Sequence, residues 1–320
     1  MIAKQMKSRR GYLMAIGVAI LVLLLLPPFY PTIFVVVLTQ ALIFGVVAMS
    51  LDILIGYTNL GSFGHGSFFA VGAYTTAILV TRYHTGFGLS LFASIAAAAA
   101  VSGLFSPLFL RTGGIYFLLI TLAVAMSVWG LAIRWVTLTG GEMGISRISR
   151  PDLGSFLDLT NHVHFYYFVA VFFIVCLILL FLIVRSPFGR TLIGIRDSEE
   201  RMKVLGYNVW LHKYLALIIT AGFAGLAGCL FAYFNKFVGP DEANLGQVME
   251  FVLMLCIGGP GTLLGAFLGA LLITILKFWV SIYTKRWLLI VGLVYIISAK
   301  YAPEGIMGLL KRFQKRGENV

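Results

Sequence analysis

Three ionisable residues interrupt the apolar stretches of this 320-residue chain. Asp52 lies near the end of the apolar run 33–55, His65 lies in a glycine-rich segment, and Glu250 stands at the start of a short apolar run. An ionisable group inside an apolar segment is costly, so by default it indicates a polar pathway or a proton relay. Each of the three also lies near a predicted helix end, where it could instead reach headgroups or water. A relay would require all three side chains to be close together.

The elements that must position these residues are membrane-spanning helices. The chain is 60% hydrophobic and 11% charged, with a mean hydropathy of +0.98, whereas soluble domains are about half apolar and about a quarter charged. At about 20 residues per crossing, the chain has room for about eight to ten helices. We therefore expect an all-α integral membrane protein, with residues 1–320 forming a single transmembrane domain.

The net charge of +12 raises the question of nucleic acid, but the placement of the cations favours membrane topology. Sixteen of the 24 Lys and Arg residues fall in four places: the N-terminal tail (Lys4, Lys7, Arg9, Arg10), Arg111, the segment 185–213, and the C-terminal tail (Lys300, Lys311, Arg312, Lys315, Arg316). Such clusters are typical of cytoplasmic loops. We expect no nucleic acid partner.

Motifs for catalysis or cofactor binding are missing from the sequence. Cys176, Cys229 and Cys256 each lie inside an apolar run, without the spacing of a metal site or a disulfide framework. The sequence has no phosphate-binding motif of the Walker A type, no nucleophile elbow and no paired carboxylates. We expect no catalytic residue, no metal and no cofactor bound by this chain. A membrane enzyme is the poorest of the functional alternatives.

The hydropathy pattern predicts ten crossings. They lie at about 11–26, 33–55, 67–81, 89–110, 115–135, 165–184, 214–235, 248–257, 262–281 and 287–299. An even number places both basic tails in the cytoplasm, with residues 136–164 as the largest outer loop; reading 248–281 as one helix gives nine and places the C-terminal cations outside. The eighth segment is too short to span unaided, so a re-entrant segment is the alternative there.

Two glycine-rich breaks, residues 56–66 and 258–261, mark candidate parts of a transport pathway. Broken backbone is tolerated at membrane depth only where it lines a cavity or packs in protein. Both breaks could also be ordinary tight turns near the headgroups. The candidate pathway residues are Asp52, Asn59, Ser62, Gly64, His65, Glu250, Gly258 and Gly259.

The segment 185–213 reads as soluble protein between apolar runs, with six cations and three acids. The sequence Ser186 to Gly189 ends the incoming helix, and the acids from Asp197 to Glu200 suit the start of a short helix at about 198–205. Gly206 then suits its end. We expect this piece to contact another protein; the alternative is a solvated loop that only sets topology.

Several stretches resemble the inner-membrane permease subunits of branched-chain amino acid ABC importers, specifically their LivM-type members. The similarity runs from about residue 35 to 310, and its most specific pieces are residues 56–74, 111–122, 139–145, 186–190 with 195–197 and 205–206, and 258–265. Departures from the family pattern stand at Asn59, where Gly is expected, and at Glu200, Arg201, Met202 and Lys203, where apolar or small residues are common.

The resemblance implies a permease of the type II-like ABC importer class in the bacterial inner membrane. Its implied partners are a second related permease, two cytoplasmic ATPases that bind ATP and Mg, a periplasmic substrate-binding protein and membrane lipid. The implied substrates are leucine, isoleucine and valine, moved by alternating access. The residues it implies for coupling to the ATPase are Arg196, Asp197, Glu199, Glu200, Arg201 and Gly206. A urea- or amide-type permease of the same family and an ion-coupled secondary transporter using Asp52, His65 and Glu250 are the alternatives.

Overall fold

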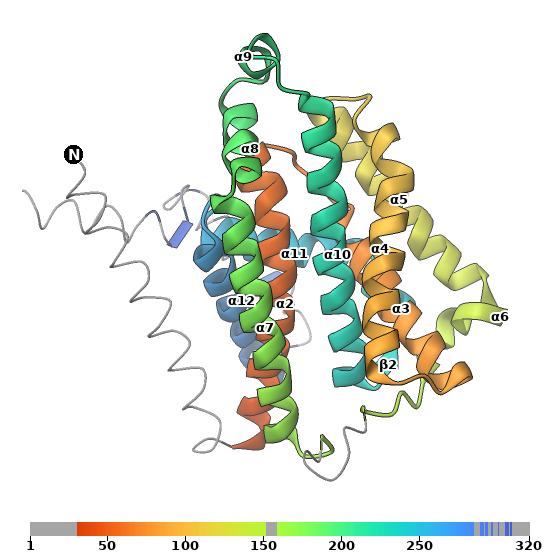
Figure 1. The fold of residues 1–320 in the computed structure, drawn as a ribbon. Coiled ribbons are helices and arrows are strands. Elements are labelled where there is room, and N and C mark those ends of the chain that lie inside the picture. Colours follow the sequence, from red (N-terminus) through yellow and green to blue (C-terminus); the bar gives the residue numbers. More distant parts are fainter. Residues whose placement is uncertain are drawn as a thin grey trace, which may run out of the picture.

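The computed structural model describes residues 31–151 and 159–284, and beyond them residues 289, 290, 292, 293, 296, 300, 305, 306 and 308. The described part is a bundle of helices (Figure 1). The longer helices are α2 (Thr32–Thr58), α3 (His65–Tyr83), α4 (Phe87–Phe109), α5 (Ile115–Arg134), α7 (His162–Arg185), α8 (Pro187–Asp197), α10 (Val209–Asn235), α11 (Leu245–Gly258) and α12 (Leu263–Tyr283). The short elements are α6 (Val136–Thr139), η2 (Gly141–Met143), β1 (Ile145–Ser146), α9 (Glu199–Val204), β2 (Phe237–Val238) and η3 (Pro240–Ala243).

Six of the described helices, α2, α4, α5, α7, α10 and α12, are long and apolar enough to cross a membrane. The predicted count of ten is not confirmed: the first predicted crossing, 11–26, and most of the last, 287–299, lie outside the described residues. The sides on which the two tails lie stay a prediction for the same reason. The predicted runs 67–81 and 248–257 correspond to α3 and to the short α11.

The bundle has two distinct ends, which Figure 1 separates along the helix axes. At one end, here called the α9 end, α7 leads through α8 and α9 into α10. At the other, here called the β-ribbon end, β1 pairs with β2 in an antiparallel ribbon with Ile145 opposite Val238. Tyr214 Oη, near the start of α10, donates to Gly103 O of α4 at 3.4 Å, and Tyr233 Oη lies 2.7 Å from Ser90 Oγ. These two contacts show that α4 and α10 run antiparallel between the ends.

Small residues on α10 allow the close helix packing that their spacing predicts. Gly225 and Gly228 face α3 and α4: a Cβ at Gly225 would lie 2.7 Å from Ser94 O, and a Cβ at Gly228 would overlap Phe69 O. The backbones of α3 and α4 therefore approach α10 at a distance that only glycine permits at these two positions. Since lipid exerts no hydrophobic force between helices, such contacts stabilise the bundle through van der Waals packing.

α11 and α12 form an antiparallel hairpin whose helices touch through glycines. A Cβ at Gly258 would overlap Gly265 O, and a Cβ at Gly269 would overlap Met254 O. With 14 residues, α11 is about 21 Å long, less than the hydrocarbon thickness of about 30 Å. The element before it, η3, packs against α3 and α5 and buries Pro240 and Ala243.

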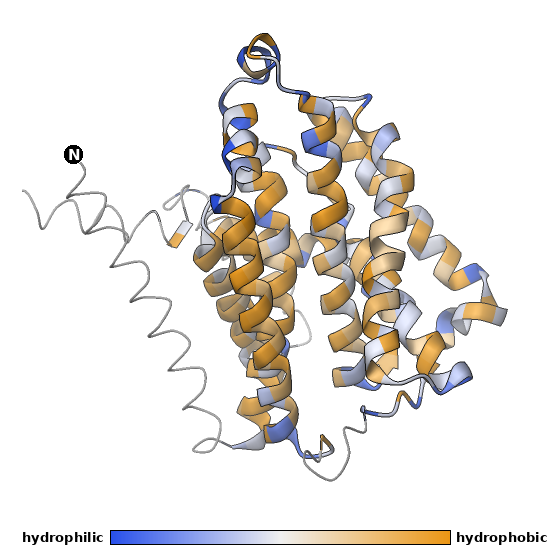
Figure 2. Cartoon of the chain, in the orientation of Figure 1, coloured by the Kyte–Doolittle hydropathy of each residue, from blue (hydrophilic) through white to orange (hydrophobic). Residues whose placement is uncertain are grey.

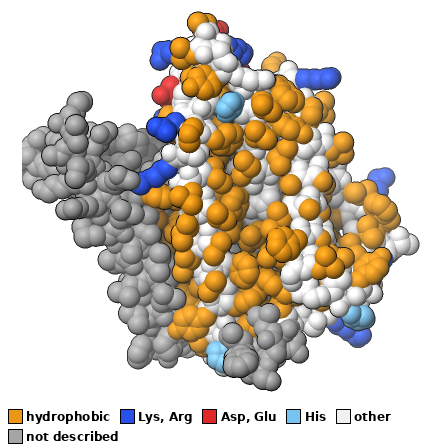
Figure 3. All heavy atoms as spheres, in the orientation of Figure 1, with side chains coloured by type: hydrophobic (Ala, Val, Ile, Leu, Met, Phe, Trp, Pro, Cys, Tyr) orange, Lys and Arg blue, Asp and Glu red, His pale blue; other side chains and the backbone are white. Residues whose placement is uncertain are grey.

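The surface of the bundle is apolar along the helices and polar at both ends (Figure 2). Figure 3 shows apolar side chains over most of one face, with charged side chains gathered around the α9 end. Large side chains on α4, α5 and α7 are exposed, among them Phe92, Leu104, Leu119 and Leu182. An apolar belt between two polar ends is the surface expected of a protein surrounded by lipid or by a second membrane subunit.

Candidate functional site

The end of α2, the start of α12 and helix α8 meet in one junction at the α9 end. Arg196 Nη1 on α8 donates to Gly56 O on α2 at 2.7 Å. One turn earlier on α2, Asp52 Oδ1 accepts a 2.6 Å hydrogen bond from Gly261 N in the turn between α11 and α12. The junction therefore brings together Asp52, Arg196 and the second glycine-rich break, which are far apart in the sequence.

Glycine is required at the centre of this junction. A Cβ at Gly56 would overlap both Asp52 Oδ1 and the backbone nitrogen of Gly261. In the turn, Gly259 and Gly261 have φ values of +102° and +83°, a region that favours glycine. The structure thus places Gly258 and Gly259 in a tight turn packed on protein, and Asp52 is completely buried as the residue that holds this turn.

Of the first glycine-rich break, predicted at 56–66, only residues 59–64 lie between α2 and α3, because its first and last residues belong to these two helices. Asn59 has φ +56° and its N–H caps α2 by donating to Leu54 O. Asn tolerates this left-handed conformation better than other residues with a side chain, which accounts for its presence where the family pattern has Gly. Ser62 Oγ accepts from Gly64 N at 3.2 Å, so both residues stabilise the loop itself.

His65 begins α3 and is 1% exposed. Neither ring nitrogen has a hydrogen-bond partner in the described part of the chain, and the ring lies edge-on to Phe68 with centroids 6.0 Å apart. A buried imidazole without partners is costly. The sequence therefore identified an unusual residue here, and the structure records its burial without assigning it a role.

Glu250 forms an ion pair inside the bundle. Lys277 Nζ on α12 donates to Oε1 and Oε2 of Glu250 at 3.1 and 2.8 Å, and the Glu250 side chain is 3% exposed. Asp52, His65 and Glu250 are all described residues, and no hydrogen bond or ion pair joins any two of them. The structure does not connect the three into a relay. Lys277 was missed by the sequence analysis, although a lone cation in the run 262–281 is the same signal that selected Glu250.

Helix α8 was not expected from the sequence. Ser186 does end α7, but its Oγ also accepts from Gly189 N at 3.2 Å and caps a new helix that begins with Pro187. Serine at the cap followed by proline at the first helical position is a strong start signal, which the interpretation as a simple stop overlooked. Asp197 is accordingly the last residue of α8 and not the first acid of the next helix.

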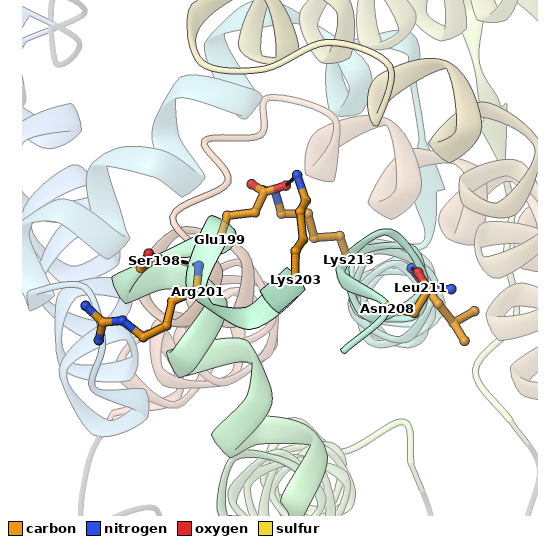
Figure 4. A network of polar contacts seen from close by, with 7 residues as sticks. All are labelled: Ser198, Glu199, Arg201, Lys203, Asn208, Leu211 and Lys213. Carbon is orange, nitrogen blue, oxygen red and sulfur yellow. Dashed lines mark hydrogen bonds and ion pairs between the residues drawn. The ribbon is translucent and has the colours of Figure 1, made fainter. Parts of the chain in front are cut away.

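Helix α9 confirms the predicted short helix between Ser198 and Gly206 (Figure 4). Ser198 Oγ caps it by accepting from Arg201 N at 3.3 Å. Gly206 follows with φ +85°, so the predicted helix stop is also confirmed. Asn208 Oδ1 then caps α10 by accepting from Leu211 N at 3.0 Å. Three local caps thus define this hairpin-like end of the molecule.

Glu199 ties α9 to α10. Its Oε2 accepts from Lys213 Nζ at 2.5 Å, and its Oε1 lies 3.3 Å from Lys203 Nζ (Figure 4). Burial alone would raise the pKa of the Glu199 carboxyl, but the hydrogen bonds and charges of Lys213 and Lys203 together lower that pKa below its ordinary value. The carboxylate is therefore ionised at neutral pH and links the two helices.

The remaining residues of α9, together with residues 205–207 that follow it, divide into an inward and an outward set. Met202 is buried on α8, where a Cβ at Gly194 would lie 2.7 Å from its Sδ. The outward set is exposed and consists of Glu200, Arg201, Lys203, Val204, Leu205, Gly206 and Tyr207. Val204 and Leu205 are 88% and 64% exposed, although they are large apolar residues at the end of the molecule where the loops are polar.

Comparison with known proteins gives matches over most of the chain. The family described as "Branched-chain amino acid transport system / permease component" matches residues 33–299. The high-affinity branched-chain amino acid transport system permease protein LivM of Salmonella typhimurium is 29% identical over 311 residues, covering 88% of this chain and 73% of that protein. The probable branched-chain amino acid transport permease protein LivM of Methanocaldococcus jannaschii is 23% identical over 292 residues, covering 81% of this chain and 84% of that protein.

A shorter match involves the tyrosine transport system permease protein of Clostridioides difficile, which is 37% identical over 75 residues, 23% of this chain and 24% of that protein. No solved structure matches the chain.

Proposed function

The chain belongs to the family of permease components of branched-chain amino acid transport systems, and on that premise we propose that it is the translocating subunit of an ATP-driven importer of leucine, isoleucine and valine. ATP hydrolysis takes place in two separate partner chains. A second permease completes the pathway across the bacterial inner membrane, and a periplasmic binding protein delivers the substrate. The relatives reported above are named for amino acids, which favours this substrate class over urea and amides.

The observation that carries this proposal is the exposed outward set of α9. It combines Val204, Leu205 and Tyr207 with the charged side chains of Glu200, Arg201 and Lys203 on a helix that projects beyond the bundle (Figure 1). A large apolar residue that is 88% exposed outside the lipid belt, as Val204 is, suits a protein partner better than water. The partner proposed for this surface is the ATPase.

A continuous set of contacts supports the transmission of movement from α9 into the bundle. Met202 packs α9 on α8, Arg196 joins α8 to Gly56 on α2, and Asp52 joins α2 to the turn before α12. Closure of the ATPases would move α9 and, through these contacts, α2 and the hairpin of α11 and α12. Packed elements of this kind shift as units.

The positive-inside rule supports placing the α9 end in the cytoplasm. Its described loops and helix ends carry Arg111, Arg185, Arg190, Arg196, Arg201, Lys203 and Lys213. The β-ribbon end carries Arg82, Arg134, Arg147, Arg150 and Lys236. With this orientation the β-ribbon end faces the periplasm, from which the substrate arrives.

The proposal is tested by purifying the chain from its native membrane and identifying what accompanies it. We expect a second hydrophobic permease and ATPases with Walker A sequences. The complex, reconstituted in vesicles with its binding protein, should accumulate leucine, isoleucine and valine only with ATP, in preference to tyrosine and urea. Accumulation by this chain alone, driven by an ion gradient, would overturn the proposal.

Charge reversal tests the role of α9 within the same assay. Glu200→Lys changes an exposed residue that forms no ion pair with a described residue, so we expect membrane insertion and complex stability to be retained while leucine uptake per ATP hydrolysed falls. Glu142→Lys, an exposed acid at the β-ribbon end, is the control and should leave this ratio unchanged. An unchanged ratio in Glu200→Lys would count against docking through α9.

A further inference from the structure

The described residues line a partly open cavity of about 440 Å³ at the β-ribbon end. Its walls come from α2, α7, α10, α11 and α12, and η3 and Arg150 also contribute to the lining. Small-molecule sites in proteins occupy about 300–1,000 Å³ and combine apolar walls with a few polar groups. The cavity is separate from the junction at the α9 end and from the outward set of α9.

One side of the cavity is aromatic. Phe44 from α2 and Phe231 and Phe234 from α10 line it, and the rings of Phe44 and Phe231 stack with centroids 5.8 Å apart. Behind them, Phe251 lies 5.4 Å from Phe44 and Phe69 lies 5.2 Å from Phe231, both measured between ring centroids. Four packed rings form a closed apolar wall against which an aliphatic side chain would be sheltered from water.

A carboxylate lines the same space. The Glu242 side chain in η3 forms no hydrogen bond or ion pair with a described residue. Burial raises the pKa of its carboxyl to about 7; Lys277 opposes this effect, and Asp241 and Glu250 add to it. An acid in such a place gains most from a ligand that brings its own positive charge.

Hydrogen-bond donors from other elements line the same cavity as Glu242. Arg150 Nη1 donates to Leu159 O at 2.7 Å and to Thr160 O at 3.0 Å, while its buried Nε has no hydrogen-bond partner among the described residues. Nε2 of Gln247 on α11 is also buried and forms no hydrogen bond within the described part of the chain. Lys277 adds a further cation, which Glu250 holds in place. Unpaired buried donors are costly unless a ligand or water satisfies them.

We propose that this cavity is a binding site for a zwitterionic α-amino acid with an apolar side chain. The ammonium group of the ligand is bound by Glu242, its carboxylate by Arg150 and Gln247, and its side chain by the aromatic wall of Phe44, Phe231 and Phe234. This assignment rests on the proposed function, for which it supplies a subsite within the permease. The assignment predicts that this chain, as well as the binding protein, selects which amino acids are transported.

The combination of groups distinguishes this ligand from simpler ones. A metal cation or an amine would match Glu242 but would leave Arg150 and Gln247 unpaired, and a fatty acid would do the reverse. A site built around buried polar groups rejects analogues that lack the matching group, because those groups then stay unsatisfied. A water-filled vestibule would show no preference for the amino acid over a cation, an amine or a fatty acid.

The test uses the intact importer complex in vesicles and a reporter cysteine, Gln40→Cys, in the cavity wall, combined with Cys256→Ser because Cys256 is not fully buried. Leucine should slow labelling by a membrane-impermeant maleimide at least about fivefold at saturation, since an occupied site is labelled only when the ligand leaves. Leucine methyl ester, which lacks the carboxylate, and 4-methylpentanoate, which lacks the ammonium group, should not protect. Equal protection by either analogue would overturn the proposal.

Two variants assign the contacts. Glu242→Gln should raise the leucine concentration for half-protection at least about tenfold, as expected for loss of a charge-assisted hydrogen bond, and the exposed control Glu142→Gln should not change it. Phe234→Ala should raise it about fivefold or more through lost apolar contact. Unchanged protection in both cavity variants would overturn the site even if each variant folds normally.

The same vesicles separate this inference from the proposed function. ATP-driven leucine uptake without protection of Gln40→Cys would overturn the site and leave the importer assignment intact. Protection by leucine without ATP-driven uptake would support the site and count against the importer assignment. The absence of both would overturn both.

Discussion

The guanidinium of Arg196 donates a 2.7 Å hydrogen bond to the carbonyl oxygen of Gly56, 140 residues earlier in the chain. This bond attaches α8, which carries α9, to the end of α2 at the level where Asp52 holds the turn between α11 and α12. The part of the chain proposed to contact the ATPase is thereby linked to α2 and to the turn between α11 and α12.

Removing this link should weaken coupling more than folding. Arg196→Ala deletes a charge-assisted hydrogen bond worth about 1–3 kcal/mol, and we expect the lower part of that range because the side chain is 41% exposed. Leucine uptake per ATP hydrolysed should fall severalfold in vesicles. Arg190→Ala, an exposed arginine on the same helix, is the matched control. Equal leucine uptake per ATP hydrolysed in the two variants would show that the hydrogen bond between Arg196 and Gly56 does not contribute to coupling.

A methyl group at Gly56 should disrupt the junction itself. The Cβ of Gly56→Ala would overlap Asp52 Oδ1 and the Gly261 backbone, which cannot move aside as a flexible side chain can. We expect destabilisation of about 1–3 kcal/mol from overpacking, measured as a lower midpoint of thermal aggregation in detergent. Gly222→Ala, where the nearest atom to the new Cβ is Ile95 Cγ2 at 3.5 Å, should be tolerated. A normal midpoint for Gly56→Ala would mean that the junction opens at little cost.

Glu199 and Lys213 should behave as a pair. Glu199→Lys places two cations where α9 meets α10, so uptake should fall; Glu199→Lys with Lys213→Glu restores opposite charges 14 positions apart and should recover much of it. The pair is partly exposed, and we therefore expect a coupling energy of no more than about 1 kcal/mol. If the charge swap does not recover uptake, the important interaction of Glu199 is with the partner protein and not with Lys213.

Protonation of Glu242 should weaken leucine protection of the cavity. Burial raises the pKa of the Glu242 carboxyl to about 7. The group is therefore negatively charged above pH 7, and it loses this charge as the pH falls below 7. Below pH 7 the leucine concentration for half-protection should rise, by up to about tenfold per pH unit. Arg150, His162, Lys277, Asp241 and Glu250 face or surround the group. Glu242→Gln should abolish the dependence; if it persists, another group such as His162 is responsible.

Glu250 should prove structural. Glu250→Gln removes the carboxylate that pairs with Lys277 inside the bundle, at a cost below the about 3–5 kcal/mol expected for a fully buried pair, because the Lys277 side chain is 27% exposed. We expect low yield and early thermal aggregation, and Glu250→Met with Lys277→Met should recover stability because no charge is then left unpaired. A stable Glu250→Gln variant that hydrolyses ATP but transports nothing would instead support a direct role in the pathway.

Periodicity and local signals determined much of the fold. The apolar runs predicted the described membrane helices to within a few residues, as for α4 (Phe87–Phe109) against 89–110, because burial in lipid imposes length and hydropathy on each helix separately. The short helix before Gly206 followed from acids at its start and a glycine at its end. Helix α8 was predictable from Ser186 and Pro187 by the same kind of local rule, and was missed.

The meaning of the ionisable residues depended on the tertiary structure. Asp52, His65 and Glu250 carried the same signal in the sequence, a polar group in an apolar run. Only the fold separated an acid that holds a turn, a histidine without partners and one half of an ion pair. The cavity between Glu242, Arg150 and Phe44 likewise joins residues from distant segments. Hydropathy acts on each segment alone, whereas partners are chosen by packing between segments, so composition and spacing determined the helices and packing decided what their polar residues do.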